Sequence, residues 1–188
     1  MHGCFAQLVF ALLVAVALFT SRSWVSAADI PATQEGLRLK RWSVLTAALV
    51  YLQLLLGGIV RHTDFFLGPR LHLLGAFVVV GLVIWLIKLI VDLPVRDRAL
   101  VNGALVLALL VGVQLFLGVE AWLGKFRSRE WPQLQPLTLH PDLLRSLHFL
   151  AGSLVFATSV AVALQAHRRI ARQIQPALVP ASRLEGAL

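Results

Sequence analysis

The sequence predicts an all-α, polytopic transmembrane bundle of five helices with a parallel internal repeat of helix hairpins. Hydrophobic residues make up 59% of the 188 positions and charged residues only 14%, whereas about 25% of a soluble domain is charged. The apolar residues gather in five blocks, each near the ~20 residues that a membrane-crossing helix needs. Backbone polar groups in lipid must bond within the chain, so each block is predicted as a helix.

The five blocks follow one another with short connections, except for about 20 residues between the fourth and the fifth. They span residues 2–19, 42–60, 71–91, 100–126 and 144–166.

Three regions follow from these blocks. Residues 1–20 are expected to form a first transmembrane helix, and residues 42–169 a four-helix unit. Residues 170–188 contain proline and alanine and are expected to form a loose tail.

Two sequence segments occur twice in the chain. The second and fourth blocks contain Gln-Leu-Leu-Leu-Gly at 53–57 and Gln-Leu-Phe-Leu-Gly at 114–118. The third and fifth blocks open with His-Leu-Leu-Gly at 72–75 and His-Phe-Leu-Ala-Gly at 148–152. The pattern predicts two copies of one hairpin in the same orientation, related by an axis along the membrane normal. Small residues and glutamine are also common between membrane helices, so the Gln/Gly segments have a purely structural reading too.

The net charge of +8 reports membrane topology, because the basic residues fall between the blocks. Nucleic acid is therefore excluded as a partner. The segments after the first, third and fifth blocks hold 11 lysines and arginines, and the other two loops hold six. The positive-inside rule places the N-terminus outside and the C-terminus in the cytoplasm of a bacterial inner membrane or its equivalent.

The first block has a second reading as a signal peptide cleaved after Ala27. The absence of Lys or Arg before the block, and Arg22 after it, favour a retained helix. Cys4 is the only cysteine, so no intramolecular disulfide and no cysteine-based metal motif is possible.

His72 and His148 are the residues that the sequence predicts as metal ligands. Each lies near the start of a helix that enters from the outer side, in equivalent places of the repeat. Two imidazoles facing each other suit the axial positions of a haem iron. Gly75 and Gly152, one turn further in, are expected to let a flat macrocycle approach the backbone. The glycines expected to do the same on the outgoing helices are Gly57, Gly58 and Gly118.

Each of these polar residues also has a structural explanation. A histidine at the end of a span can simply reach water, although a matched pair favours ligation. Arg61 and Arg70 are candidates for haem propionates or for ordinary interfacial anchoring. Glu120 is a candidate for a proton-handling carboxylate or for a pair with Lys125 at the outer surface, and the pair is the favoured interpretation. Outside the proposed site are His62 at the end of the second block, His140 in a loop and His167 in a basic cluster.

These motifs resemble the haem A synthase family. The similarity lies in Gln-Leu-Leu-Leu-Gly-Gly-Ile-Val-Arg-His-Thr at 53–63 and in the His-led helices at 71–75 and 147–152. The family has eight transmembrane helices in two similar halves, and the resemblance covers the last five. It implies oxidation of the C8 methyl group of haem O to give haem A for cytochrome oxidase. It also implies haem b as cofactor on His72 and His148.

The start of the chain resembles the fourth helix of that family, with His2 on the substrate-haem side. The family's first three helices are missing, and with them the partner of His2 and the family's catalytic glutamate. We therefore expect a truncated chain, a separate polypeptide that completes the site, or a homo-oligomer. The implied partners are haem O, membrane lipid, haem O synthase and an electron donor.

Two other classes of function remain open from the sequence. One is a non-catalytic haem-binding or electron-transfer membrane subunit. The other is a small transporter or assembly scaffold without a cofactor, which parallel repeats would suit. Few polar residues lie within the blocks to line a transport pathway, so the third reading is the weakest.

Overall fold

The computed structural model describes residues 2–63, 65–130 and 141–171, and within these ranges every regular element is a helix. Side chains are described for 3–63, 65–123 and 143–171. The prediction of an all-α chain is confirmed for this part of the protein. The helices are α1 (His2–Phe19), α2 (Arg22–Val25), α3 (Gln34–His62), α4 (Gly68–Val91), α5 (Arg98–Glu130) and α6 (Pro141–Arg169).

Four of the described helices are long and apolar enough to cross a membrane. The qualifying stretches are Gln34–His62, Gly68–Val91, Arg98–Leu123 and Leu143–Arg169. Helix α1 is also apolar, but its stretch Gly3–Phe19 is shorter than the other four. The chain therefore has the helix lengths and composition of a multi-pass membrane protein.

The helices extend beyond the predicted apolar blocks because polar residues cap them. Helix α3 begins eight residues before its block, where the Thr33 hydroxyl accepts a hydrogen bond from the Gly36 amide at 3.1 Å. The Asp97 carboxylate precedes α5 and accepts bonds from the amides of Ala99 and Leu100, at 2.9 and 3.0 Å. Both side chains satisfy amides that a helix start leaves unpaired. Hydrophobicity alone does not mark these ends.

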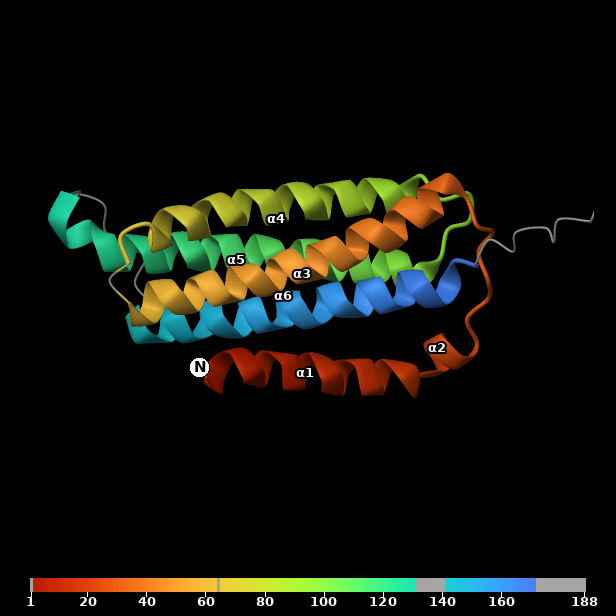
Figure 1. Ribbon diagram of the computed structural model, residues 1–188, viewed down its shortest axis with the longest axis horizontal. Coiled ribbons are helices and arrows are strands. Elements are labelled where there is room, and N and C mark those ends of the chain that lie inside the picture. Colours follow the sequence, from red (N-terminus) through yellow and green to blue (C-terminus); the bar gives the residue numbers. More distant parts are fainter. Residues whose placement is uncertain (1, 64, 131–140, 172–188) are drawn as a thin grey trace, which may run out of the picture.

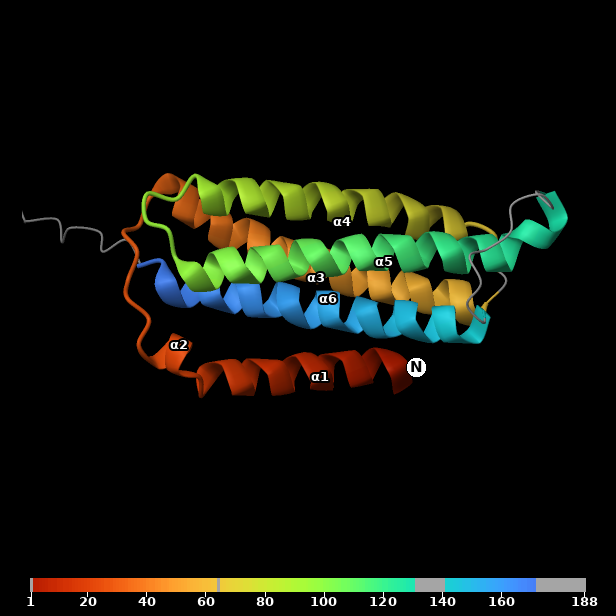
Figure 2. The same cartoon turned by 180° about the vertical axis from the view of Figure 1, so that it is seen from behind.

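Helices α3 to α6 pack as an antiparallel group of four, shown from opposite sides in Figures 1 and 2. Each helix lies beside the next along the chain, and α6 closes the group against α3. Helices α4 and α6 therefore face each other diagonally. Helix α1 lies alongside, mainly against α6. The starts of α4 and α6 lie at one end of the molecule, which we call the histidine end (Figure 1).

Leucines and small polar residues share the interior between the helices. Leu39, Leu100 and Leu107 are no more than 1% exposed, and Ser43 and Thr46 are fully buried. The two hydroxyls donate to carbonyls of their own helix, at 3.0 Å for Ser43 and 2.7 Å for Thr46. Bonded in this way, they add no unpaired polar group to the interior and let the helices approach closely.

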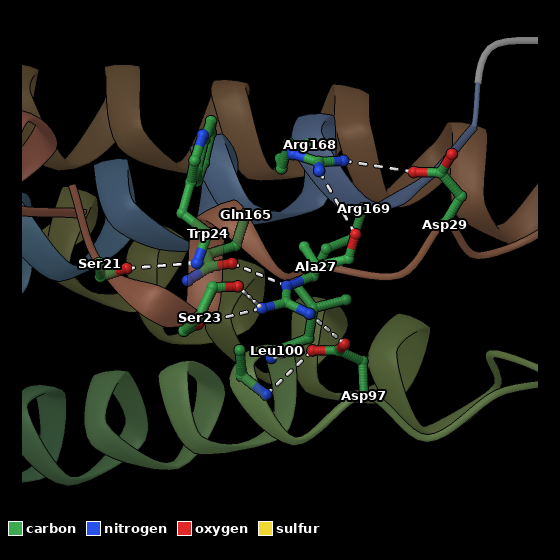
Figure 3. Close-up of polar contacts among 11 residues, drawn as sticks. Ser21, Ser23, Trp24, Ala27, Asp29, Asp97, Leu100, Gln165, Arg168 and Arg169 are labelled. Carbon is green, nitrogen blue, oxygen red and sulfur yellow. Dashed lines mark hydrogen bonds and ion pairs between the residues drawn. The ribbon is translucent and has the colours of Figure 1, made fainter. Parts of the chain in front are cut away.

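A buried arginine joins three segments at the end of the molecule opposite the histidine end (Figure 3). Arg169, in the last turn of α6, pairs with the Asp97 carboxylate at 2.5 Å. Its guanidinium also donates to the Gln165 side chain and to the Ser23 backbone oxygen, each at 2.7 Å. Residue Ile30 then pairs with the backbone at the end of α6. These contacts attach the segment after α1 to the four-helix group.

Candidate functional site

His72 and His148 face each other across the four-helix group. His72 lies in the second turn of α4, and His148 lies near the start of α6. Their ring centroids are 6.3 Å apart, and the ring planes are nearly perpendicular at 79°. Because α4 and α6 are diagonal neighbours, the two imidazoles approach from opposite sides of the interior. The structure thus brings together the pair that the sequence singled out.

Helix α3 forms the surroundings of His72. The Gln53 side chain donates to the His72 backbone oxygen at 2.6 Å. The imidazole lies against Gly57, where an added Cβ would be 3.2 Å from Cε1 of the ring. A side chain at position 57 would therefore require the ring to move by a few tenths of an ångström.

Helix α5 gives His148 similar surroundings. A Cβ added at Gly118 would lie 3.0 Å from Cε1 of the His148 ring. The nitrogen of the Gln114 side chain is 3.3 Å from Nε2 of His148. Each histidine thus contacts a glutamine and a glycine, four residues apart, on the preceding helix.

Gly75 and Gly152 lie beneath the two glutamine side chains. A Cβ added at Gly75 would collide with the side-chain oxygen of Gln53. At Gly152 it would lie 3.1 Å from the side-chain nitrogen of Gln114. The glutamine amides therefore occupy the space over these two glycines. The approach of a macrocycle there stays a prediction.

The site holds buried polar atoms without partners among the described residues. These atoms are Nδ1 of His72 and His148 and the side-chain oxygens of Gln53 and Gln114. Buried polar atoms are paired in most proteins, so four in one place call for an explanation. A group that binds between the histidines and rearranges the amides would provide one.

The separation of the two rings is that of two imidazoles bound to one metal ion. A metal–imidazole bond is about 2.0–2.1 Å, so rings that share one ion have nitrogens about 4 Å apart and centres roughly 6 Å apart. The observed separation of the centroids is 6.3 Å. The described residues contain no cluster of three or more His, Cys, Asp or Glu that could hold a bare metal ion. A metal whose remaining ligands come from a macrocycle fits this donor set better.

The two arginines assigned to the site lie at its margin. Arg61 and Arg70 are exposed, as is His62 at the end of α3. The Arg70 guanidinium lies 5.9 Å from the centroid of the Phe66 ring. In the described residues, no hydrogen bond or ring contact joins either arginine to the histidine pair, so their role toward propionates stays a prediction.

The remaining polar candidates lie elsewhere. Glu120 is buried in α5, with 6% of its surface exposed, and the side chain of Lys125 is outside the described part. His167 is exposed near the end of α6 and bonds to the Ala163 carbonyl at 2.9 Å. His2 belongs to α1, but its side chain is not described, and residue His140 lies outside the described ranges. The tail at 172–188 also lies outside them.

Two features of the structure were not anticipated from the sequence. The contacts of Gln53 and Gln114 with the histidines were not foreseen, although their repeated spacing relative to the glycines was a usable signal. The sequence indicates only that Arg169 is one of several basic residues near the end of the last helix. In the structure its side chain is buried against Asp97. An isolated Asp directly before a helix is the one clue to that contact.

No protein-family model, curated protein or solved structure matches the chain. Only the geometry of the histidine pair and the resemblance of its motifs therefore bear on the chemistry of the site.

Proposed function

We propose that the protein is a haem-binding membrane protein of the haem A synthase type, with His72 and His148 as axial ligands of one haem b iron. The observation that carries this proposal is the approach of the two imidazoles from diagonal helices, with centroids 6.3 Å apart. Intramembrane ionisable side chains are rare and mark functional sites by default. Two that meet inside a helix bundle therefore favour ligation over interfacial anchoring.

The residues around the pair support this assignment. Neutral imidazole binds a metal through one ring nitrogen, so each histidine can supply one ligand. Gly57 and Gly118 let each ring lie directly on the backbone of the neighbouring helix. That position restricts the rotation of the rings. A bound haem b would supply one-electron chemistry, with a potential set by its axial ligands and by burial.

We further propose that the reaction is the oxidation of haem O to haem A. This step depends on the resemblance of the motifs. Converting a methyl group to a formyl group removes electrons and adds an oxygen atom, so the step needs dioxygen with an electron donor, or water with an electron acceptor. It also needs a second haem site that includes His2. Haem O synthase is the corresponding source of substrate. The described residues bring together one facing histidine pair, and a non-catalytic haem-binding or electron-transfer subunit is the alternative that needs no more than this pair.

The proposal includes a membrane arrangement. Five spans, with α1 as the first, would place the N-terminus outside and the C-terminus in the cytoplasm of the bacterial inner membrane. The distribution of Lys and Arg supports this orientation. The matching contacts of Gly57 with His72 and of Gly118 with His148 support a parallel repeat of hairpins.

Absorption and electron paramagnetic resonance spectra of the full chain, purified from haem-replete cells, test the haem assignment. We expect a low-spin signal of two imidazole ligands that is lost in His72→Ala and in His148→Ala. His62→Ala and His167→Ala are matched controls, because both side chains are exposed, and they should keep the signal. A colourless wild-type protein, or an unchanged spectrum in both site variants, rules out the assignment.

Chromatography of haems extracted from cells that make haem O and this chain separates the two functions. Accumulation of haem A that depends on His72 and His148 supports the oxidoreductase. A coloured protein with no haem A in the extract favours the non-catalytic subunit.

A further inference from the structure

Gln114 and Gln53 contact their histidines in different ways. The Gln114 side-chain nitrogen is 3.3 Å from Nε2 of His148, a nitrogen that could bind metal. The Gln53 side chain instead donates to the backbone oxygen of His72. Among the described residues, no side chain donates a hydrogen bond to Nε2 of His72. The two imidazoles are therefore unequal at the atom that matters for ligation.

The contact of Gln114 bears on the tautomer of the His148 ring. With the amide nitrogen of Gln114 as the donor, Nε2 of His148 is the acceptor and the ring proton sits on Nδ1. That Nδ1 is buried and has no partner in the described residues. A metal binds the lone pair of an unprotonated ring nitrogen. Gln114 thus selects the tautomer that can bind metal at Nε2 and covers the same lone pair.

The Gln114 side chain is placed to cover this nitrogen without being fixed there. It sits over Gly152, where a Cβ would lie 3.1 Å from its nitrogen. Its oxygen has no hydrogen-bond partner in the described residues. The bond to His148 is just longer than the usual 2.7–3.2 Å of an N–H donor. One weak bond therefore holds the amide in place.

We propose that Gln114 is a displaceable cap on Nε2 of His148, so that His72 is open to a metal centre while His148 becomes available only when the amide moves away. This inference depends on the haem site proposed above and assigns Gln114 as a positioning residue within it. Moving the Gln114 amide away from His148 breaks one hydrogen bond inside a membrane protein. The cap should therefore weaken haem binding by roughly three- to tenfold.

A haem-transfer experiment tests the affinity. Full-length protein in lipid nanodiscs competes for haem b with excess apomyoglobin, and the partition is measured by absorption. We expect Gln114→Leu to hold haem roughly three- to tenfold more tightly than wild type. Gln53→Leu is the matched control and should bind equally or more weakly, because Gln53 does not cover a ring nitrogen. Equal gains in both variants, or no gain in Gln114→Leu, overturn the proposal.

A second measurement needs neither haem nor a stable variant at position 114. Nitrogen chemical shifts of ¹⁵N-histidine in the haem-free wild-type chain report the tautomer of each ring, with His148 assigned from the spectrum of His148→Gln. We expect His148 with its proton on Nδ1, and a proton on Nε2 overturns the cap. A wild-type protein that binds no haem contradicts the proposed function instead, and the nitrogen shifts still decide whether Gln114 caps His148.

Discussion

The imidazole of His72 lies directly on the backbone of Gly57, where a Cβ would come within 3.2 Å of Cε1 of the ring. His148 and Gly118 repeat this contact at 3.0 Å. Ordinary van der Waals contacts of a Cβ fall at 3.4–4 Å. The glycines therefore permit a close approach of each ring to the neighbouring helix, and a Cβ at either position would require the ring to shift by a few tenths of an ångström.

Alanine at either glycine should displace the adjacent ring. We expect Gly57→Ala and Gly118→Ala to lower the free energy of unfolding by about 1–3 kcal/mol, since an added methyl group in a packed interior forces its neighbours to shift. The larger effect is expected at Gly118, where the contact is shorter. Both variants should also retain less haem. Thermal unfolding followed by circular dichroism measures the first effect, and the ratio of haem to protein measures the second.

Gly58 provides the control for this prediction. It is the next residue in α3, and a Cβ there would meet nothing within 4 Å. Because alanine favours a helix over glycine by about 0.5–1 kcal/mol, Gly58→Ala should be neutral or stabilising. If Gly57→Ala is as stable and as rich in haem as Gly58→Ala, the packing argument is wrong.

The helical part of the fold could be predicted from hydrophobic blocks, but the helix ends could not. The block at 2–19 coincides with α1 (His2–Phe19). By contrast, α3 starts at Gln34 rather than at position 42, because the intervening turns are polar and are started by the Thr33 cap. Hydropathy indicates which residues lie in lipid. It does not show where a helix ends when its last turns are polar and lie at the membrane surface.

The histidine pair was predictable because a repeated pattern places both residues at the same point of a hairpin. The orientation of the glutamine side chains could not be predicted, because sequence spacing does not fix a rotamer. For this reason the sequence does not show that Gln114 contacts the ring of His148 while Gln53 contacts the backbone of His72. The contact of Arg169 with Asp97 joins residues 72 positions apart, and neither lies in a recognisable motif.

Arg169 should be important for stability through its pairing with Asp97. The side chains are only 7% and 15% exposed, so Arg169→Met would leave a nearly buried carboxylate without its partner. Breaking a buried pair in this way costs about 3–5 kcal/mol. We expect a loss of that order in chemical unfolding of Arg169→Met, with release of α2 because the bonds to Ser23 are lost too.

Two comparisons separate the buried pair from a general charge effect. Lys88→Met removes one partner of the Lys88–Asp92 pair, whose side chains are 60% and 40% exposed, and should cost about 0–1 kcal/mol. The double variant Asp97→Asn/Arg169→Met should lose less than the sum of the single changes, because neither charge is then left unpaired. Additive losses would contradict a direct interaction between the two residues.

Tyr51 of α3 should contribute to stability mainly through its ring, which contacts Phe156 of α6. Its hydroxyl reaches the Cys4 carbonyl of α1 at 3.5 Å, a long hydrogen bond, whereas its ring lies 5.2 Å from that of Phe156 between centroids. We expect Tyr51→Phe to change stability by less than about 1 kcal/mol. Because Tyr51 is half-buried, Tyr51→Ala should cost more than that but less than the ~3–5 kcal/mol of a fully buried aromatic side chain. Thermal unfolding of the two variants distinguishes these contributions, and a large loss in Tyr51→Phe would show that the hydroxyl matters more than the ring.

Gln7 in α1 provides the opposite prediction, a substitution that stabilises. The side chain is only 5% exposed, and its oxygen has no hydrogen-bond partner among the described residues. An unpaired buried amide oxygen costs about 1–3 kcal/mol, whereas an apolar group of similar shape avoids that penalty. We therefore expect Gln7→Leu to raise the free energy of unfolding by about 1 kcal/mol or more.

Leu8→Ala on the exposed side of the same helix is the control and should change the free energy of unfolding little, since Leu8 is 42% exposed. Unfolding of both variants in the same lipid nanodiscs measures the difference. A clear loss of stability in Gln7→Leu would mean that the amide binds a group that the apolar side chain cannot replace.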